Sequence, residues 1–509
     1  MKSLVYSFCS FLDPHLGVLM ERAERLNAAG HEVTFAYCAG CMDVCGQNPQ
    51  GSRLICAYCR FTYWRMLKRL SRGIKLLPVK AYPCPHREWN YATLEDFRQL
   101  RHGATYVGYG ALSTYITLTR NSRPNVADEK VRRYLDHLLD EGAAQTDWLN
   151  SYLDGHETDE VHIYTGRLVE NRAFYDIAKA RGITFYSNEV VGSFRAETDF
   201  MPITYKNALP HNLMVNKEMA EQLWRQKDCP LEEKMEGGRR FYERRRSNKP
   251  AGDRVYTAGQ EKGMLPEGFD RTKKNIVVFN SSEDEFAAIG KDFDDYQLFK
   301  NQTEGIIYLL DNLPKDDYHV YVRIHPNLTR VKYDYVLELY NLPSRYPNVT
   351  LIPPSSPVST YALMDAADKV VVFGSTAGAE ATYAGKPVVL LGPSFYYFLD
   401  VAYAPDSKQD SIRLLTTDDL PPKDRDNALK YAYFLMNRHR LTEPSRFVDL
   451  RIRYPRFLNV RFCITAYSTL LGSSLLMKLS TIAVTYGLRR FGKWKMGDGF
   501  FHDPFYKKL

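Results

Sequence analysis

The sequence predicts an α/β protein with two Rossmann-like domains that face a cleft, followed by a C-terminal helical tail. In both halves of the chain, strand-like segments rich in Val, Ile and Leu alternate with helical segments. This pattern is typical of parallel sheets with helices on both faces. The length of 509 residues suits two domains of about 200 to 250 residues plus a tail.

Composition narrows the class of partner. Hydrophobic residues make up 44% of the chain and charged residues 25%, which is ordinary for a globular protein. The net charge of +8 is modest, 36 Tyr and 26 Phe accompany it, and no nucleic-acid recognition motif is present. We therefore expect an anionic ligand or a membrane surface as partner and no nucleic acid.

The first half, residues 1–240, begins as a βαβ unit. A strand at 3–8, a helix at 16–29 and a strand at 31–38 follow one another, and Gly30 ends the helix. The apolar start stops at Asp13 and Pro14, short of a signal peptide, so we expect a cytoplasmic protein. We expect mostly helix over 60–155, and then strand, helix and strand again from 161 to about 189.

The second half alternates more regularly. Residues 241–274 are basic and rich in Gly and Pro, which predicts an interdomain linker. The second domain, 275–445, carries five strand segments: NIVVFNSS, YHVYVRIHPN, VTLIPP, KVVVFGS and PVVLLG. Basic residues flank two short uncharged runs in the tail, 446–509. These predict amphipathic helices on the inner face of the plasma membrane; packing against the protein and true spanning are the alternatives.

The segment FGSTAGAEATYAGKPVVLLG, residues 373–392, is the most informative motif. It places Ser375, Thr376 and Gly378 between a buried strand and a helix, where backbone N–H groups and the helix dipole receive a phosphate. Glu380 in the first helical turn would accept hydrogen bonds from ribose hydroxyls. A tight turn without a ligand is the alternative.

Two further motifs end strands of the same predicted sheet. In RIHPN, Pro326 stops the strand and leaves His325 at its carboxyl edge, facing a nucleotide phosphate. In FNSSEDE, Ser281 and Ser282 would donate to phosphate, while Glu283 is equally well explained as a helix-opening carboxylate. A purely structural His325 is the alternative.

These three motifs resemble bacterial capsule and lipopolysaccharide glycosyltransferases described as capsule polysaccharide biosynthesis proteins, and more distantly the transferases that use CMP-activated Kdo or sialic acid. The resemblance covers about 275–405. It implies the GT-B fold, a nucleotide-sugar donor held by His325 and the 375–380 loop, and a saccharide or lipid-linked oligosaccharide acceptor.

The first half of the chain carries a further resemblance. TGR at 165–167 and Glu189 are similar to an element of the same family, which implies that Arg167 binds an acceptor anion and that Glu189 orients a sugar hydroxyl. An unpartnered surface arginine and strand-end carboxylate are the alternative.

An inverting transfer needs a base for the acceptor hydroxyl and positive groups for the departing phosphate. We expect His15, and after it Asp13, to be the base, because their loop follows the first strand. Asp13 as a turn former before Pro14 is the alternative. No Asp-x-Asp pair lies at the predicted sheet edge, so we expect transfer without a catalytic metal.

Five cysteines lie within 22 residues: Cys38, Cys41, Cys45, Cys56 and Cys59. Four thiolates suit a structural zinc, with Cys38, Cys45, Cys56 and Cys59 as the expected ligands and Cys41 spare or in place of Cys45. Free buried thiols or a redox pair are the alternative, because the spacing is irregular.

The sequence thus predicts a glycosyltransferase with the donor in its C-terminal domain and the acceptor in its N-terminal domain. Two alternatives stay open. A nucleotide-sugar 2-epimerase would turn over its donor without an acceptor, and a nucleotide-sugar-binding subunit of a polysaccharide assembly complex would bind the donor without turnover.

Overall fold

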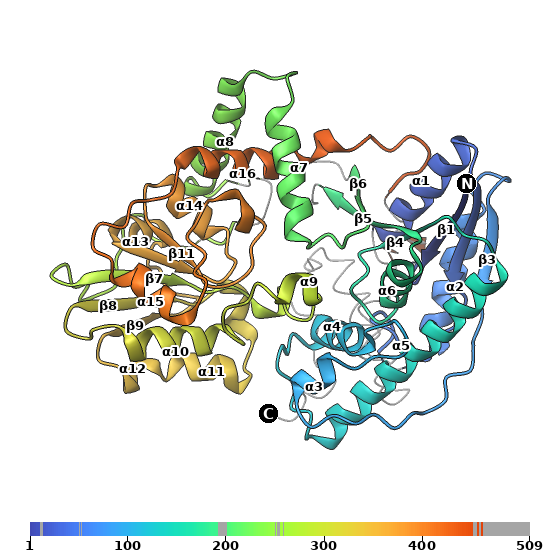
Figure 1. The fold of residues 1–509 in the computed structure, drawn as a ribbon, viewed down its shortest axis with the longest axis horizontal. Helices are drawn as coiled ribbons and strands as arrows, with labels where there is room; N and C mark the ends of the chain where they lie inside the picture. The colour runs from blue at the N-terminus through green and yellow to red at the C-terminus, as the bar shows by residue number, and fades with distance from the viewer. Residues whose placement is uncertain are drawn as a thin grey trace.

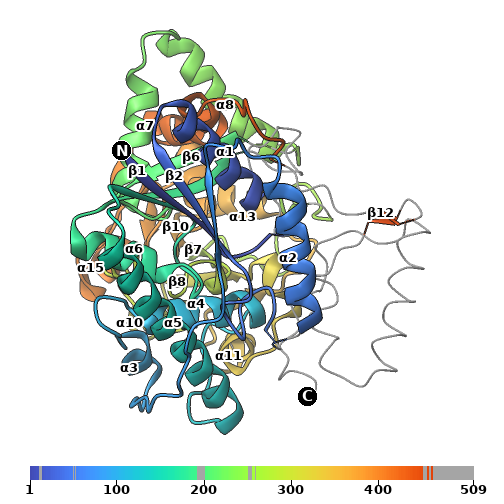
Figure 2. The same cartoon turned by 90° about the vertical axis from the view of Figure 1, so that its right-hand side faces the viewer.

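The structure, a computed structural model, has two α/β domains that lie side by side (Figure 1). It describes residues 1–10, 14–49, 51, 53–191, 201–249, 251, 255–257, 259–450, 456–457 and 460–461. Seen from the side of the N-terminal domain, the strands of its sheet lie in front of those of the C-terminal domain (Figure 2). Two parallel-dominated sheets, each in its own domain, form the predicted GT-B architecture.

The N-terminal domain is built on a six-stranded sheet in the order β3-β2-β1-β4-β5-β6. All neighbours are parallel except β5 and β6, which are antiparallel. Alternate residues of the first strand enter different cores, Leu4 and Tyr6 on one face and Val5 on the other, because strand side chains alternate. The strands are β1 (Lys2–Ser7), β2 (Glu32–Cys38), β3 (Lys75–Val79), β4 (Glu160–Tyr164), β5 (Thr184–Val191) and β6 (Met201–Lys206).

Helices cover both faces of this sheet. The longest has Asp128 as its N-cap, whose side chain accepts the N–H groups of Lys130 and Val131. Tyr6 stacks on Phe174 at 4.2 Å between ring centroids and joins the sheet to the helix layer. The helices are α1 (His15–Ala28), α2 (Arg53–Leu67), α3 (Leu94–Arg98), α4 (Val107–Thr119), α5 (Glu129–Gly155) and α6 (Arg172–Arg181).

The structure corrects the expectation of a mostly helical stretch over 60–155 at residues 80–93, which form neither helix nor strand, and at β3. Its sequence, KLLPV, pairs with β2 at the edge of the sheet. Proline is tolerated at a sheet edge, where one side of the strand needs no ladder bonds. The short segment lacks apolar alternation, so its strand conformation comes from the neighbouring β2.

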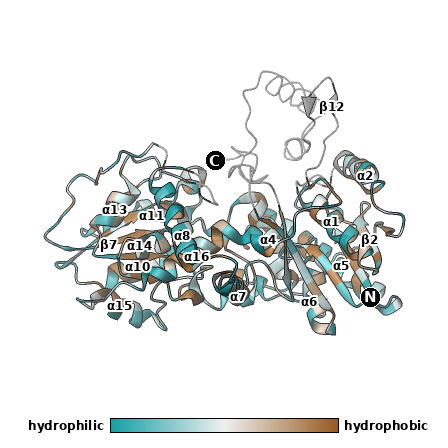
Figure 3. Cartoon of the chain, turned by 90° about the horizontal axis from the view of Figure 1, so that it is seen from above, coloured by the Kyte–Doolittle hydropathy of each residue, from teal (hydrophilic) through white to brown (hydrophobic). Residues whose placement is uncertain are grey.

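The C-terminal domain is built on a five-stranded parallel sheet in the order β11-β10-β7-β8-β9. Its central strand sends Val277 and Phe279 into one core and Ile276 and Val278 into the other. Seen from above, brown apolar residues gather on the strands around β7, and teal residues mark the outer helices and loops (Figure 3). The strands are β7 (Lys274–Phe279), β8 (Tyr318–Arg323), β9 (Val349–Ile352), β10 (Lys369–Val372) and β11 (Val388–Leu390).

Helices connect these strands, and the last two helices follow the final strand. They are α9 (Lys291–Asp294), α10 (Gln302–Asn312), α11 (Asp334–Tyr340), α12 (Leu342–Arg345), α13 (Thr360–Ala366), α14 (Ala377–Tyr383), α15 (Lys408–Thr416) and α16 (Arg425–Asn437), with 3-10 turns at Glu283–Glu285, Pro326–Arg330, Tyr397–Leu399 and Arg438–Leu441. The strand-to-helix loops of β7, β8 and β10 all leave the carboxyl edge of the sheet, where ligands of parallel sheets bind.

Two helices before the predicted linker belong to the C-terminal domain. Leu223 of α7 (Leu213–Arg225) and Phe241 and Tyr242 of α8 (Leu231–Arg246) share a buried cluster with Val277 of β7. The Tyr242 hydroxyl donates to the carbonyl of Ala428 in α16 at 2.7 Å. This packing places the domain boundary before α7 and corrects the predicted boundary at residue 240 and the predicted linker start at 241.

The chain returns from the C-terminal domain to the N-terminal domain after α16, as the red segment in Figure 1 shows. Buried Glu21 of α1 accepts the backbone N–H groups of residues 446–448 and the Ser445 hydroxyl, all within 3.0 Å. The backbone of Leu450 packs against Gly17, where a Cβ would lie 2.4 Å from the Leu450 carbonyl oxygen. The end of the predicted second domain, 442–445, therefore contacts the first domain.

The two domains also contact each other through the loop after β7. Arg120, which follows α4, donates to both carboxylate oxygens of Asp284 at 2.8 and 3.2 Å and to the Asn327 carbonyl at 3.1 Å. Arg123 donates to the carboxylate of Glu283 at 3.0 Å. The carboxylates of this loop thus hold the domains together, and Glu283 also begins the 3-10 turn that follows β7.

Of the helices in the described ranges, none combines the length and the apolarity needed to cross a bilayer. Beyond residue 450, two short strands, β12 (Arg456–Phe457) and β13 (Val460–Arg461), pair antiparallel. The predicted tail helices lie outside the described residues.

Candidate functional site

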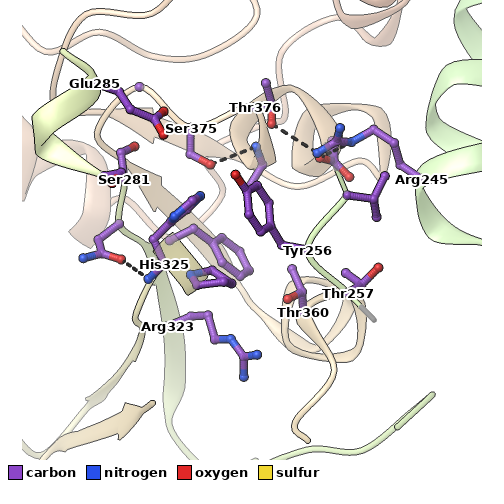
Figure 4. A pocket seen from close by; sticks show the side chains of 18 of the residues that line it. Arg245, Tyr256, Thr257, Ser281, Glu285, Arg323, His325, Thr360, Ser375 and Thr376 are labelled. Carbon is purple, nitrogen blue, oxygen red and sulfur yellow. Dashed lines mark hydrogen bonds and ion pairs between the residues drawn. The ribbon is translucent and has the colours of Figure 1, made fainter. Parts of the chain in front are cut away.

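The three motifs of the second domain meet at one cavity of about 410 Å³. Figure 4 shows side chains from the ends of β7, β8 and β10 around a common opening. Ser281, His325, Ser375, Thr376 and Glu380 all line it, as does Ser282, so six of the seven predicted donor residues come together. Gly378 does not line it. The carboxyl edge of the sheet therefore forms one pocket of the size that small-molecule sites have.

His325 is held at the edge of the pocket by its neighbours. Its backbone N–H donates to Asn280 Oδ1 at 2.7 Å, and its Nδ1 accepts the N–H of Asn327 at 3.2 Å. A neutral ring that accepts at Nδ1 carries its proton on Nε2, so it is set up to donate. The Tyr256 ring meets the imidazole edge-on at 5.0 Å between centroids (Figure 4).

The serines and threonine of the pocket are partly engaged within the protein. The Ser282 hydroxyl donates to Asp284 at 2.5 Å and accepts from Arg120 at 3.0 Å, so it serves the domain contact. Ser375 Oγ accepts the N–H of Ala377 at 3.2 Å, which opens α14. Thr376 Oγ1 lies 3.4 Å from Arg245 Nη2.

Glu380 is a buried ion-pair partner, which differs from the expected role of a ribose acceptor. Its Oε1 accepts from Arg245 Nε at 2.9 Å and its Oε2 accepts from the Tyr361 hydroxyl at 2.7 Å. The Arg245 and Glu380 side chains are 9% and 7% exposed. Glu380 therefore fixes Arg245 at the base of the pocket, because a buried charge requires a partner.

The glycines of the phosphate-loop motif have different tasks. Gly374 has φ +107°, and a Cβ there would lie 2.5 Å from the carbonyl oxygen of Pro393, so only glycine fits. Gly378 lies on α14, where a Cβ would lie 2.3 Å from the hydroxyl of Tyr396. That hydroxyl donates to the Ser375 carbonyl at 2.6 Å and so stabilises the loop between β10 and α14. Gly378 is thus a packing position in this structure.

Arg323, at the end of β8, is the strongest signal of a bound anion. It is 4% exposed and lines the pocket. Its guanidinium donates to the carbonyls of Val358 and Ser356 at 3.1 and 3.3 Å, and its Nε has no hydrogen-bond partner within the described chain. Burial lowers the pKa of Arg323 to about 10. No carboxylate among the described residues forms an ion pair with it, and burial alone shifts its pKa.

On the N-terminal side, Arg167 and Glu189 lie next to each other, beside the pocket wall. Thr165 and Gly166 have φ +57° and +102°, a strained turn that aims Arg167 at the second domain. Arg167 Nη1 lies 3.5 Å from the carbonyl oxygen of Glu285, which lines the pocket. Burial raises the pKa of Glu189 to about 7, against the opposing effects of a Tyr164 hydrogen bond and the Arg167 charge.

His15, the expected base, does not line this pocket. It begins α1 and stacks on the ring of Tyr164 at 3.5 Å between centroids. Burial lowers its pKa to about 3, and its Nδ1 has no partner in the described structure. Glu189 does not line the pocket either. Asp13 lies outside the described residues.

The five clustered cysteines lie in the β2–α2 region without forming a four-sulfur group. The Cys41 thiol donates to Cys38 Sγ at 3.4 Å, while Asn48 contacts Cys56 and Ser10 contacts Cys59, each at 3.2 Å. In the described chain, no three of these sulfurs belong to a set of ligand atoms within 4.8 Å of one another. Zinc binding by the cysteines stays a prediction.

Sequence reasoning missed Arg245, Arg323 and Tyr256. Arg323 lies two residues before His325 in the same motif, so its position at the sheet edge could have been predicted from the sequence. Arg245 belongs to a run of basic residues that resembles a solvated linker, and only the packing of α8 turns it toward Glu380. Tyr256 comes from the irregular segment before β7, for which periodicity gives no signal.

The protein is thus a two-domain α/β protein with a cation-lined cavity at the carboxyl edge of its second sheet. Residues 279–434 match the model of a family described as capsule polysaccharide biosynthesis protein, which confirms the predicted resemblance over that segment. No curated protein matches the sequence.

Solved structures with a similar arrangement are distant. The beta Kdo 2,4 transferase KpsC of Thermosulfurimonas dismutans is 15% identical, with 55% of this chain and 79% of that chain covered and a TM-score of 0.34. The UDP-GlcNAc 2-epimerase of Neisseria meningitidis bound to UDP-GlcNAc is 13% identical, with 87% and 100% covered and a TM-score of 0.28. The Streptomyces sp. SF2575 glycosyltransferase SsfS6, complexed with thymidine diphosphate, is 14% identical, with 86% and 96% covered and a TM-score of 0.21.

Proposed function

We propose that the protein is a glycosyltransferase that moves a sugar from a nucleotide-activated donor onto a saccharide acceptor of a growing surface polysaccharide. The observation that carries the proposal is Arg323, a buried guanidinium without a carboxylate partner in the described chain, at the strand-end pocket. A bound phosphate or carboxylate supplies the missing counter-charge. The family match over 279–434 supports capsule synthesis as the setting.

The pocket has the charge that a nucleotide-sugar donor needs. Arg245, Arg323 and Arg438 line it together with two carboxylates, of which Glu380 is already paired with Arg245. The excess positive charge and the Nε2 donor of His325 stabilise the phosphate that departs in the transfer. We propose that these groups, without a divalent metal, neutralise the leaving group.

The N-terminal domain supplies the acceptor side. Glu189, with its pKa raised by burial to about 7, takes the proton of the acceptor hydroxyl as general base. Arg167 beside it binds an anionic group of the acceptor. Arg167 lies 3.5 Å from the carbonyl oxygen of Glu285, which lines the donor pocket, so the proposed acceptor side adjoins that pocket where the domains meet. A lipid-linked acceptor and a membrane-bound tail are part of the proposal.

A coupled assay tests this function. Purified protein is given CMP-, UDP- and GDP-activated sugars with and without oligosaccharide acceptors, and nucleotide release is measured for wild type, His325→Ala and Glu189→Gln. We expect acceptor-dependent release with one donor, lost in both variants. Epimerised sugar without acceptor would instead identify a 2-epimerase. Tight donor binding with no turnover of any acceptor would identify a non-catalytic subunit.

A further inference from the structure

A second site lies in the N-terminal domain, away from the nucleotide pocket. The side chains of Asp43, His137 and Glu141 bring one ligand atom each to within 4.8 Å of one another. Of the described residues, these are the only three or more His, Cys, Asp or Glu side chains gathered so closely. Asp43 and His137 border a cavity of about 390 Å³, and the buried Glu141 lies behind them; this cavity shares no lining residue with the pocket at the second sheet.

Secondary structure fixes two of these side chains. His137 and Glu141 are four residues apart on α5, so they lie one above the other on the same helical face. His137 Nε2 is 3.6 Å from Glu141 Oε1, which is too long for a good hydrogen bond. Ligand atoms bound tetrahedrally at about 2.1 Å lie about 3.4 Å apart, so the separation matches two ligands of one ion.

The β2–α2 loop brings Asp43 to this face. Glu141 Oε1 accepts the backbone N–H groups of Asp43 and Val44 at 2.6 and 3.2 Å. Glu170, also fully buried, accepts the N–H of Gly46. Two buried carboxylates therefore hold the loop backbone in place, and the exposed Asp43 side chain stays at the cavity.

Glu141 is the independent sign of a ligand. Its side chain is 0% exposed, and its Oε2 has no hydrogen-bond partner among the described residues. A buried carboxylate oxygen without a partner costs free energy, which a bound cation removes. The cavity lining adds the carboxylates of Glu129, Asp136 and Asp140 against only two arginines, so the site favours positive charge.

We propose that Asp43, His137 and Glu141 bind a zinc ion. One imidazole nitrogen and two carboxylate oxygens are a donor set that zinc takes, with water in the fourth position. The ion joins the β2–α2 loop to α5 and so orders the end of the first sheet. Asp43 lies between Cys41 and Cys45 in sequence, so the proposed site is separate from the zinc site predicted at Cys38, Cys45, Cys56 and Cys59.

Metal content of the full-length protein tests the proposal. The protein is stripped with a chelator, reloaded with zinc, dialysed and analysed by mass spectrometry of the metal. Wild type should hold about one zinc per chain, and zinc should raise its Tm by about 5 °C or more. His137→Ala and Glu141→Gln should lose both effects, and glutamine keeps the acceptor that the Asp43 and Val44 N–H groups need.

Two controls make the test specific. His86 lines the same cavity and pairs with Asp140 at 2.9 Å, so His86→Ala should keep the zinc. A Cys56→Ser, Cys59→Ser double variant should keep it too, and the cobalt-substituted protein should lack a sulfur-to-cobalt charge-transfer band. The proposal would be overturned by any of three results: wild type that holds no zinc after reloading, a His137→Ala variant that retains zinc, or a cysteine double variant that loses it.

Discussion

Replacing Arg323 with methionine separates binding from stability. Burial lowers the pKa of Arg323 to about 10, a shift that corresponds to about 3 kcal/mol against the charged form. Methionine has a similar shape and no charge, but it leaves the carbonyls of Val358 and Ser356 without their donors, at about 1 kcal/mol each. The difference leaves the variant more stable than wild type by about 1 kcal/mol.

Nucleotide affinity should change in the opposite direction. A charge-assisted hydrogen bond to phosphate contributes about 1.5 to 3 kcal/mol, so Arg323→Met should weaken binding of the preferred nucleotide about 10- to 150-fold. Calorimetry measures the affinity and thermal unfolding measures the Tm. Arg246→Met, which removes an ion pair with Asp365 outside the pocket, is the matched control. A large drop in Tm with unchanged affinity would refute the anion-binding role.

Four further outcomes follow from the structure. Glu189→Gln should lower turnover about 10²- to 10⁴-fold. In wild type, kcat/KM should fall below about pH 7 as Glu189 is protonated, and the variant should lack this fall. A pH profile that is the same in both proteins would exclude Glu189 as the base. Gly374→Ala should lower the Tm more than Gly385→Ala, because both have positive φ but only Gly374 faces a backbone oxygen. Glu380→Gln should destabilise the protein by about 3 kcal/mol by leaving the buried Arg245 without its ion-pair partner, whereas the exposed Glu129→Gln should leave the Tm unchanged. Below pH 6.5 His15 takes up a proton in the unfolded chain but not in the native protein, where burial lowers its pKa to about 3. Acidification therefore favours the unfolded state, and His15→Phe should reduce the loss of unfolding free energy by about 1.4 kcal/mol per pH unit. Equal acid sensitivity of wild type and variant would contradict this.

The sequence by itself determined the two sheets and the edge at which the site forms. Val277 and Phe279 alternate with Ile276 and Val278, so both faces of the strand are apolar and a parallel sheet follows. Motifs at the ends of such strands must share one edge, which is why His325, Ser281 and the 374–380 loop meet at a single pocket.

Only the tertiary structure decided which charges are paired. Glu380 and Arg245 are 135 residues apart, and nothing in either local pattern shows that they form a buried ion pair. The β3 strand and the membership of α7 and α8 in the second domain depend on neighbours distant in sequence, since β3 is stabilised by β2 and α8 by α16. The same holds for Asp43 and Glu141: periodicity places a residue on a face, but long-range packing determines which group it meets there.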